Sequence, residues 1–217
     1  MPTRTAGART DIGRVVAVTV FVLLLLMNLR KLATGAWAES PLSILVSVLT
    51  GAFYVLLIVA YLRRTPSDRT DRRWSSWAVA LAGTAAPFFI PVLSTGPATG
   101  TVRELVSAAI LGIGLVAMLW ALGALGTNIS VVPQARTMVT HGPYQLVRHP
   151  LYAAELVNVL GLCVSRTGVW PWLVFVALIT FQVARARREE ALLSRELPGY
   201  VEYRASTPML VPALRRR

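Results

Sequence analysis

The chain has 217 residues, of which 55% are hydrophobic and only 15% are charged, and its mean hydropathy is +0.59. This balance is typical of an integral membrane protein and argues against an ordinary soluble domain. The net charge is +12, but the arginines lie at the ends of apolar runs. That is the pattern of a membrane protein, so we expect no nucleic-acid partner.

Four apolar runs approach or exceed the about 20 residues that a membrane-crossing helix needs. They cover roughly 14–29, 42–62, 74–94 and 103–125. A fifth apolar region, 151–184, is interrupted at 165–171 by glycine and proline, which predicts two short helices, about 151–164 and 170–184, folded as a hairpin. We therefore expect one all-α integral membrane domain over 1–217, with about six membrane segments. Four transmembrane helices occupy 1–125, and a loop, the hairpin and a cytosolic tail occupy 126–217.

The distribution of basic residues predicts how the chain is oriented. With the N-terminus in the cytoplasm, the outer side holds only four of the 22 basic residues, namely Arg30, Lys31, Arg103 and Arg166. Because basic residues concentrate in cytoplasmic segments, we expect a protein of the inner or plasma membrane with both termini in the cytoplasm. The loop 126–149 and the tail 185–217 then flank the same hairpin on one side, so we expect them to meet.

Cysteine and histidine are scarce. Cys163 is the only cysteine and lies in an apolar run, so we expect it to serve in packing. The only histidines are His141 and His149, so the sequence predicts no metal site.

The loop ahead of the hairpin carries a candidate ligand site. His149 stands before Pro150, and proline in this position is typical of the first turn of a helix. The start of a helix leaves free N–H groups that suit an anionic ligand. A lone histidine is usually structural, but this one has polar and aromatic neighbours that favour contact with a ligand, namely Tyr144, Arg148 and Tyr152.

The tail carries the second half of the candidate site. Arg185 and Glu189 are four residues apart, so an ion pair along one helix is the simplest interpretation. Glu189 and Glu190 differ by about 100° around a helix. We therefore expect one of them to face the site and the other to pair with arginine. Tyr200 and Tyr203 share one helical face, and either close over a flat ring or anchor the membrane interface.

Glu155 lies about one turn inside the first hairpin helix, with Asn158 nearby. A carboxylate in an apolar segment is costly and usually faces protein or a cavity. An acid or base role toward a substrate is one interpretation. The others are that Glu155 reaches toward the interface or bonds to a neighbouring helix.

Two stretches of this sequence, GPYQLVRHPLYAAEL and RREEALLSRELPGYVEYRASTPMLVP, resemble the isoprenylcysteine carboxyl methyltransferase family and its phospholipid methyltransferase relatives. The similarity covers about residues 137–212. It implies a membrane enzyme that transfers a methyl group in line from S-adenosylmethionine to a lipid or lipid-anchored acceptor, such as an isoprenoid, at the cytosolic membrane edge. S-adenosylhomocysteine would be the other product.

The resemblance also implies which residues bind and react. The cofactor-binding positions of the family fall on Tyr144, Arg148, His149, Pro150, Tyr152, Glu189, Glu190, Tyr200 and Tyr203. Arg148 and the helix start suit the carboxylate of the cofactor, a glutamate suits its ammonium group, and tyrosine faces suit its adenine and sulfonium. The candidate catalytic residues are Arg148, Glu155 and Glu190. Ala154 stands where the family often has glycine, which separates this chain from its relatives at the substrate end.

Two alternatives remain open on the sequence. Sterol reductases are similar in their C-terminal membrane domain, which would make the chain an NADPH-dependent membrane reductase. A membrane lipid-binding protein without catalytic activity is the other alternative.

Overall fold

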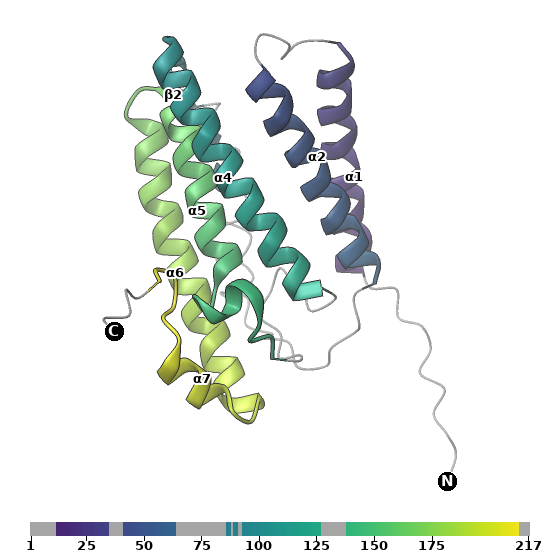
Figure 1. The fold of residues 1–217 in the computed structure, drawn as a ribbon, viewed down its shortest axis with the longest axis vertical. Helices are drawn as coiled ribbons and strands as arrows, with labels where there is room; N and C mark the ends of the chain where they lie inside the picture. The colour runs from purple at the N-terminus through teal and green to yellow at the C-terminus, as the bar shows by residue number, and fades with distance from the viewer. Residues whose placement is uncertain are drawn as a thin grey trace.

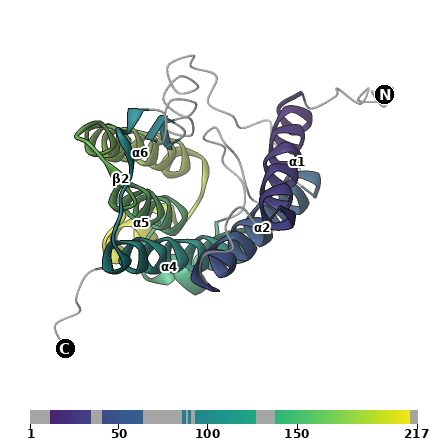
Figure 2. The same ribbon diagram turned by 90° about the horizontal axis from the view of Figure 1, so that it is seen from above.

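The computed structural model describes residues 12–34, 41–63, 86–87, 89–90, 93–126 and 138–212, and these ranges are mainly α-helical. The helices stand roughly side by side (Figure 1). Seen from above, they form a curved row in the order α1, α2, α4, α5 and α6 (Figure 2).

The N-terminal part of the row is a helical pair. Helix α1 spans Ile12–Ala33 and helix α2 spans Pro41–Leu62. Pro41 occupies the first position of α2, where a missing N–H leaves no hydrogen bond unmade. Tyr61 of α2 is almost fully buried and packs in one apolar cluster with Leu57 of α2 and Leu122 of the next described helix. This cluster joins the pair to the rest of the row.

Helix α4 spans Thr101–Leu125 and packs closely against α5, which spans Pro150–Val164. The close approach depends on glycine. A Cβ atom at Gly114 would lie 2.8 Å from the backbone nitrogen of Asn158, and one at Gly161 would lie 2.9 Å from that of Leu111. The sequence therefore brings the two backbones together through small residues, as in many membrane helix pairs.

The predicted hairpin is present. Helix α6 spans Trp170–Glu196 and returns alongside α5, as Figure 1 shows. Val159, Cys163 and Leu178 form a buried apolar cluster between the two helices. The Cys163 thiol is fully buried and donates a hydrogen bond to the carbonyl of Pro171 at 3.3 Å, which confirms its packing role. Helix α6 continues twelve residues beyond the end of the predicted hairpin segment, from 184 to Glu196.

A small strand pair at the turn of the hairpin was not expected in an all-α fold. Strand β1, Gly96–Pro97, pairs antiparallel with β2, Arg166–Thr167. Arg103 at the start of α4 reinforces the pairing: its Nε donates to the carbonyl of Val164 at 2.8 Å and its Nη2 to that of Arg166 at 2.9 Å. These contacts tie the start of α4 to the far end of α5 and α6.

Two helices in the described ranges, Ile44–Leu62 and Thr101–Leu125, are long and apolar enough to cross a membrane. The apolar parts of α1, Ala17–Arg30, and of α5 are shorter. The predicted span 74–94 lies mostly outside the described residues. The predicted spans 42–62 and 103–125 are thus confirmed as helices of sufficient length, and the total of six segments remains a prediction.

The end of the bundle opposite β1 and β2 holds the C-terminal elements. The loop before α5 forms a short 3-10 helix, η2, over Gly142–Gln145, in which Gly142 has a φ of 61° that favours glycine. Helix α7, Tyr200–Ser206, follows α6 and lies beside this loop (Figure 1). The loop and the tail therefore do meet, as the predicted topology required.

Candidate functional site

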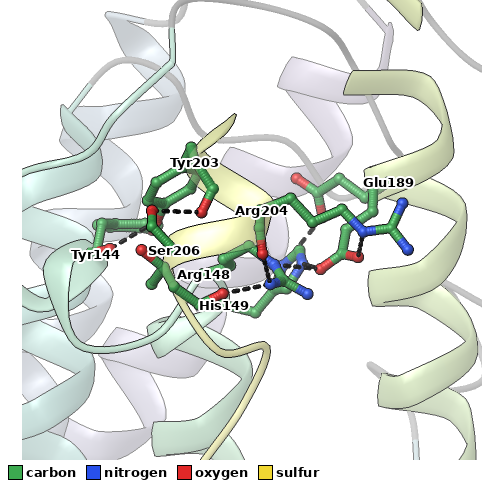
Figure 3. A network of polar contacts seen from close by, with 9 residues as sticks. Tyr144, Arg148, His149, Glu189, Tyr203, Arg204 and Ser206 are labelled. Carbon is green, nitrogen blue, oxygen red and sulfur yellow. Dashed lines mark hydrogen bonds and ion pairs between the residues drawn. The ribbon is translucent and has the colours of Figure 1, made fainter. Parts of the chain in front are cut away.

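A network of polar side chains joins the loop, the end of α6 and α7 at one end of the bundle (Figure 3). Arg148 and His149 come from the segment immediately before α5, and Glu189 and Glu190 come from the last part of α6. Since α5 and α6 run antiparallel, the first residues of one meet the last residues of the other. The hairpin thus positions these groups at its open end.

Arg148 is the hub of the network. Its Nε donates to Oε1 of Glu190 at 2.8 Å, and its Nη1 donates to the carbonyl of Arg204 at 2.8 Å and to that of Thr207. Its guanidinium therefore links the start of α5 to α6 and to the C-terminal end of α7. Cationic groups at the end of a helix stabilise its unpaired carbonyls.

The tail also accepts hydrogen bonds from the backbone amides just before α5. The amide of Arg148 donates to the carbonyl of Pro208 at 2.8 Å, and the amide of His149 donates to that of Met209 at 3.1 Å. We predicted from the sequence that Arg148 and the free amides here would face an anionic ligand. In the structure these donors bond to carbonyls of the tail instead, because residues 204–209 pass beside the start of α5.

Glu190 is a buried carboxylate with several partners. Nε2 of His149 hydrogen-bonds to its Oε1 at 3.1 Å, and Nε of Arg204 lies 3.5 Å from its Oε2. Burial alone would raise the pKa of Glu190, but the hydrogen bonds and positive charge supplied by His149 and Arg148 outweigh it and lower that pKa to about 2. Glu190 is therefore a fixed anion at neutral pH.

Glu189 faces a different set of groups. The hydroxyl of Tyr152 donates to its Oε2 at 2.8 Å, and the side chain retains 26% of its exposure. The rings of His149 and Tyr152 are stacked, with centroids 5.3 Å apart and planes within 2°. The two glutamates thus point in different directions, as their angular separation predicted, although His149 lies between them, with its Nδ1 3.9 Å from Glu189 Oε2. Glu189 is the more accessible of the two.

Three tyrosines line the tail side of the network. The hydroxyl of Tyr203 donates to the carbonyl of Tyr144 at 2.6 Å, and the Tyr200 and Tyr203 rings meet edge to face at 6.0 Å. The Tyr200 hydroxyl is buried and has no hydrogen-bond partner within the described ranges. Burial raises the pKa of Tyr144 and of Tyr200, and raises that of Tyr203 to about 12, so all three remain neutral at physiological pH.

Glu155 does not join this network. Nε2 of Gln182 on α6 donates to its Oε2 at 2.6 Å, one helical turn deeper into the hairpin than Tyr152. Between the two levels, the guanidinium of Arg185 lies 4.7 Å from the centre of the Tyr152 ring. Glu155 thus bonds to a neighbouring helix, which was one of the interpretations left open.

Sequence reasoning did not select Gln182 or the tail residues that contact Arg148. Gln182 has a readable signal, because it is a polar residue inside an apolar run, like Glu155. The tail carbonyls have none, since any residue type supplies one. In the described part of the chain no cluster of side chains could hold a metal ion.

Comparison with known proteins finds similarity to one protein family and to two bacterial relatives. Residues 102–198 match the model of a family described as phospholipid methyltransferase. The chain is also 32% identical over 112 residues to nickel-cobalt-cadmium resistance protein NccN of Alcaligenes xylosoxydans xylosoxydans, covering 50% of this chain and 53% of that one. Cobalt-zinc-cadmium resistance protein CzcN of Cupriavidus metallidurans is 31% identical over 109 residues, covering 45% and 50%.

The chain therefore spans about half the length of the curated relatives that it matches. The family match includes the hairpin and both glutamates, and it ends before Tyr200 and Tyr203. The region 102–198, with α4, the hairpin and most of the polar network, is therefore similar to phospholipid methyltransferases, in agreement with the resemblance seen in the sequence.

Proposed function

We propose that the chain is an integral-membrane methyltransferase that uses S-adenosylmethionine and acts on a lipid or lipid-anchored acceptor by in-line transfer at the cytosolic membrane edge. One observation carries the proposal. At the open end of the hairpin, inside the family-matched region, Glu189 and Glu190 are held against His149, Arg148 and Tyr152. An apolar hairpin with a charged, aromatic mouth suits a polar cosubstrate and a hydrophobic acceptor.

The residues present fit this cosubstrate. Glu189 is a partly exposed carboxylate that suits an ammonium group, and the buried Tyr200 hydroxyl is a donor that still needs an acceptor such as a ribose or adenine atom. The half-buried ring of Tyr203, which meets Tyr200 edge to face, suits a sulfonium, with an attraction of about 0.5–2 kcal/mol per cation–π contact. When bound, S-adenosylmethionine supplies an electrophilic methyl group.

The remaining site residues position these groups. Arg148 and Glu190 lock the start of α5, the end of α6 and α7 together, and Tyr203 fixes the backbone at Tyr144. Pro150 sets the first turn of α5, so that Tyr152 faces Glu189. Holding two reactants in line can supply on the order of 7–11 kcal/mol of a reaction barrier. We propose that this rigidity is the main contribution of the chain.

Calorimetric titration of the purified chain with S-adenosylhomocysteine tests the proposal. We expect saturable binding by the unmodified protein, and we expect Glu189→Gln to weaken it at least about tenfold, which corresponds to about 1.4 kcal/mol. Glu202→Gln is the matched control, because Glu202 is an exposed carboxylate on α7. We expect it to leave the affinity unchanged.

Two further results would contradict the proposal. One is saturable binding of NADPH without binding of S-adenosylhomocysteine, which is the outcome expected of a reductase. The other is absence of both, together with no transfer of a radiolabelled methyl group to a native membrane lipid extract, which is the outcome expected of a lipid-binding protein without activity.

A further inference from the structure

The facing sides of α5 and α6 carry a continuous polar seam that runs from the mouth of the hairpin into its apolar interior. Three contacts cross from α5 to α6 at successive depths. The Tyr152 hydroxyl donates to Glu189 at 2.8 Å, the Arg185 guanidinium lies 4.7 Å from the centre of the Tyr152 ring, and the Gln182 amide donates to Glu155 at 2.6 Å. The spacing of three or four residues on each helix keeps these side chains on one face. The proposed function uses only the first level.

The deepest level lies well inside the hairpin. Gln182 precedes Glu189 by seven residues, which is about 10 Å along a helix. Just beyond it, Leu178 and Cys163 are completely buried and close the seam with apolar packing. The Glu155–Gln182 pair is therefore the floor of the seam.

Gln182 is only half satisfied. The residue is fully buried, and its Nε2 donates to Glu155. This bond fixes the orientation of the amide, because only the nitrogen can donate to a carboxylate. Its Oε1 is buried and has no hydrogen-bond partner among the described residues. An unmet buried acceptor costs about 1–3 kcal/mol, so this oxygen suits the donor group of a ligand.

We infer that Glu155 and Gln182 bind the polar end of the methyl acceptor, and that this end is a hydrogen-bond donor, a hydroxyl or an amine, rather than a carboxylate. The inference rests on the proposed function and adds the substrate class to it. The two groups offer oxygen acceptors at the floor of the seam. A hydroxyl or amine at the end of an apolar molecule would satisfy Gln182 Oε1 and reach Glu155.

The charges along the seam agree with this assignment. The guanidinium of Arg185 near the floor lies against the Tyr152 ring and interacts favourably with the charges of Glu189 and Glu155. A carboxylate acceptor would place a third negative charge close to these two. A neutral donor adds none.

Glu155 also completes the proton balance of the transfer. A lone pair on the acceptor oxygen or nitrogen forms the new bond to the methyl carbon while the methyl–sulfur bond breaks, and the bonding pair remains on sulfur. The acceptor must then lose the proton of its hydroxyl or amine, and the Glu155 carboxylate takes it. A carboxylate acceptor would release no proton, so a buried base would have no purpose there.

Three amphiphiles with the same chain test the inference: 1-dodecanol, dodecylamine and dodecanoate. The full chain, reconstituted in phosphatidylcholine nanodiscs with S-adenosylhomocysteine, is examined by thermal shift for binding of each probe, and methyl transfer to each is followed with radiolabelled S-adenosylmethionine. We expect the alcohol or the amine, or both, to bind and to be methylated. Comparing these two probes shows whether the acceptor group is a hydroxyl or an amine. We expect dodecanoate to do neither.

Substitutions then locate the effect. We expect Glu155→Gln to lower methyl transfer at least about a hundredfold, as loss of a general base does. We expect Gln182→Met to weaken binding of the donor probe about fivefold or more, because the acceptor oxygen is gone. Both should keep the affinity for S-adenosylhomocysteine within about twofold. Thr180→Val is the matched control, because Thr180 is an exposed polar residue on α6 whose hydroxyl donates to the carbonyl of Val176 in its own helix.

The outcomes separate this inference from the proposed function. If the unmodified chain does not bind S-adenosylhomocysteine, the proposed function fails. If it binds but prefers dodecanoate, or binds none of the probes, the inference alone is overturned. Equal loss of S-adenosylhomocysteine affinity in Glu155→Gln and Gln182→Met would also overturn it, since the pair would then belong to the cosubstrate site.

Discussion

Glu189 and Glu190 are neighbours in the sequence and both lie near His149, but their hydrogen-bond partners differ. Glu190 is buried against Arg148 and His149, whereas Glu189 is partly exposed and accepts a hydrogen bond from Tyr152. The divergence was predictable because helix geometry separates adjacent residues by about 100°. Which glutamate takes which side was not predictable, since it depends on the rotation of α6 relative to α5.

Glu190 gives a pH dependence whose sign follows from its pKa. Its pKa falls from 4.5 to about 2 on folding, so it stabilises the fold above pH 4.5 and this contribution is lost as pH falls toward 2. We expect Glu190→Gln to have a lower melting temperature than the unmodified chain at pH 7. The difference should shrink as pH falls below 4.5. Thermal unfolding in micelles across this range measures it.

The exposed Glu202 provides the comparison for this experiment. Glu202→Gln should follow the unmodified chain at every pH. If the difference in melting temperature between Glu190→Gln and the unmodified chain stays constant from pH 7 to pH 2.5, the charge of Glu190 does not stabilise the fold.

At the scale of elements, the apolar runs predicted the helices well and their connections poorly. The bounds of α2, α4 and α5 lie within two residues of the predicted segments, because long apolar runs with proline or glycine at their ends are strong signals. Strands β1 and β2 have two residues each, too few for any periodicity. Their pairing depends on contacts between segments about 70 residues apart, which no local pattern contains.

Glycine at the contact of α4 and α5 leads to a prediction about packing. A Cβ atom at Gly161 would lie 2.9 Å from the backbone nitrogen of Leu111, so Gly161→Ala must push the helices apart. We expect a loss of about 1–3 kcal/mol of stability, as is usual for overpacking. Unfolding in mixed micelles, followed by circular dichroism, measures the change.

Gly112 is the matched control, because nothing lies within 4 Å of the position of its Cβ. Gly112→Ala should be neutral or slightly stabilising, since alanine favours a helix by up to about 1 kcal/mol over glycine. Equal destabilisation by both substitutions would mean that the loss does not come from crowding at the contact of α4 and α5. Gly112 and Gly114 lie in the same apolar run of the sequence, and only the structure shows that Gly114 is at the contact.

At the scale of the whole molecule, the two ends of the bundle differ in chemistry. One end holds the charged network and α7, and the other holds β1, β2 and Arg103 (Figure 1). Helix α2 ends at the same end of the bundle as the charged network, whereas the chain at β1 lies at the opposite end (Figure 1). This is the arrangement that the predicted span at 74–94 requires, although most of that span lies outside the described residues.

The orientation of the bundle remains a prediction from the distribution of basic residues, and cysteine labelling tests it. Cys163 is fully buried, so we expect little background labelling of the unmodified chain by a membrane-impermeant maleimide. Cysteine is introduced at an exposed residue at each end, as Glu202→Cys in α7 and Thr101→Cys at the start of α4. In spheroplasts, we expect Thr101→Cys to be labelled and Glu202→Cys to be labelled only after lysis. The reverse pattern would place the charged network outside the cell, where a cytoplasmic cosubstrate could not reach it, and would contradict both the topology and the proposed function.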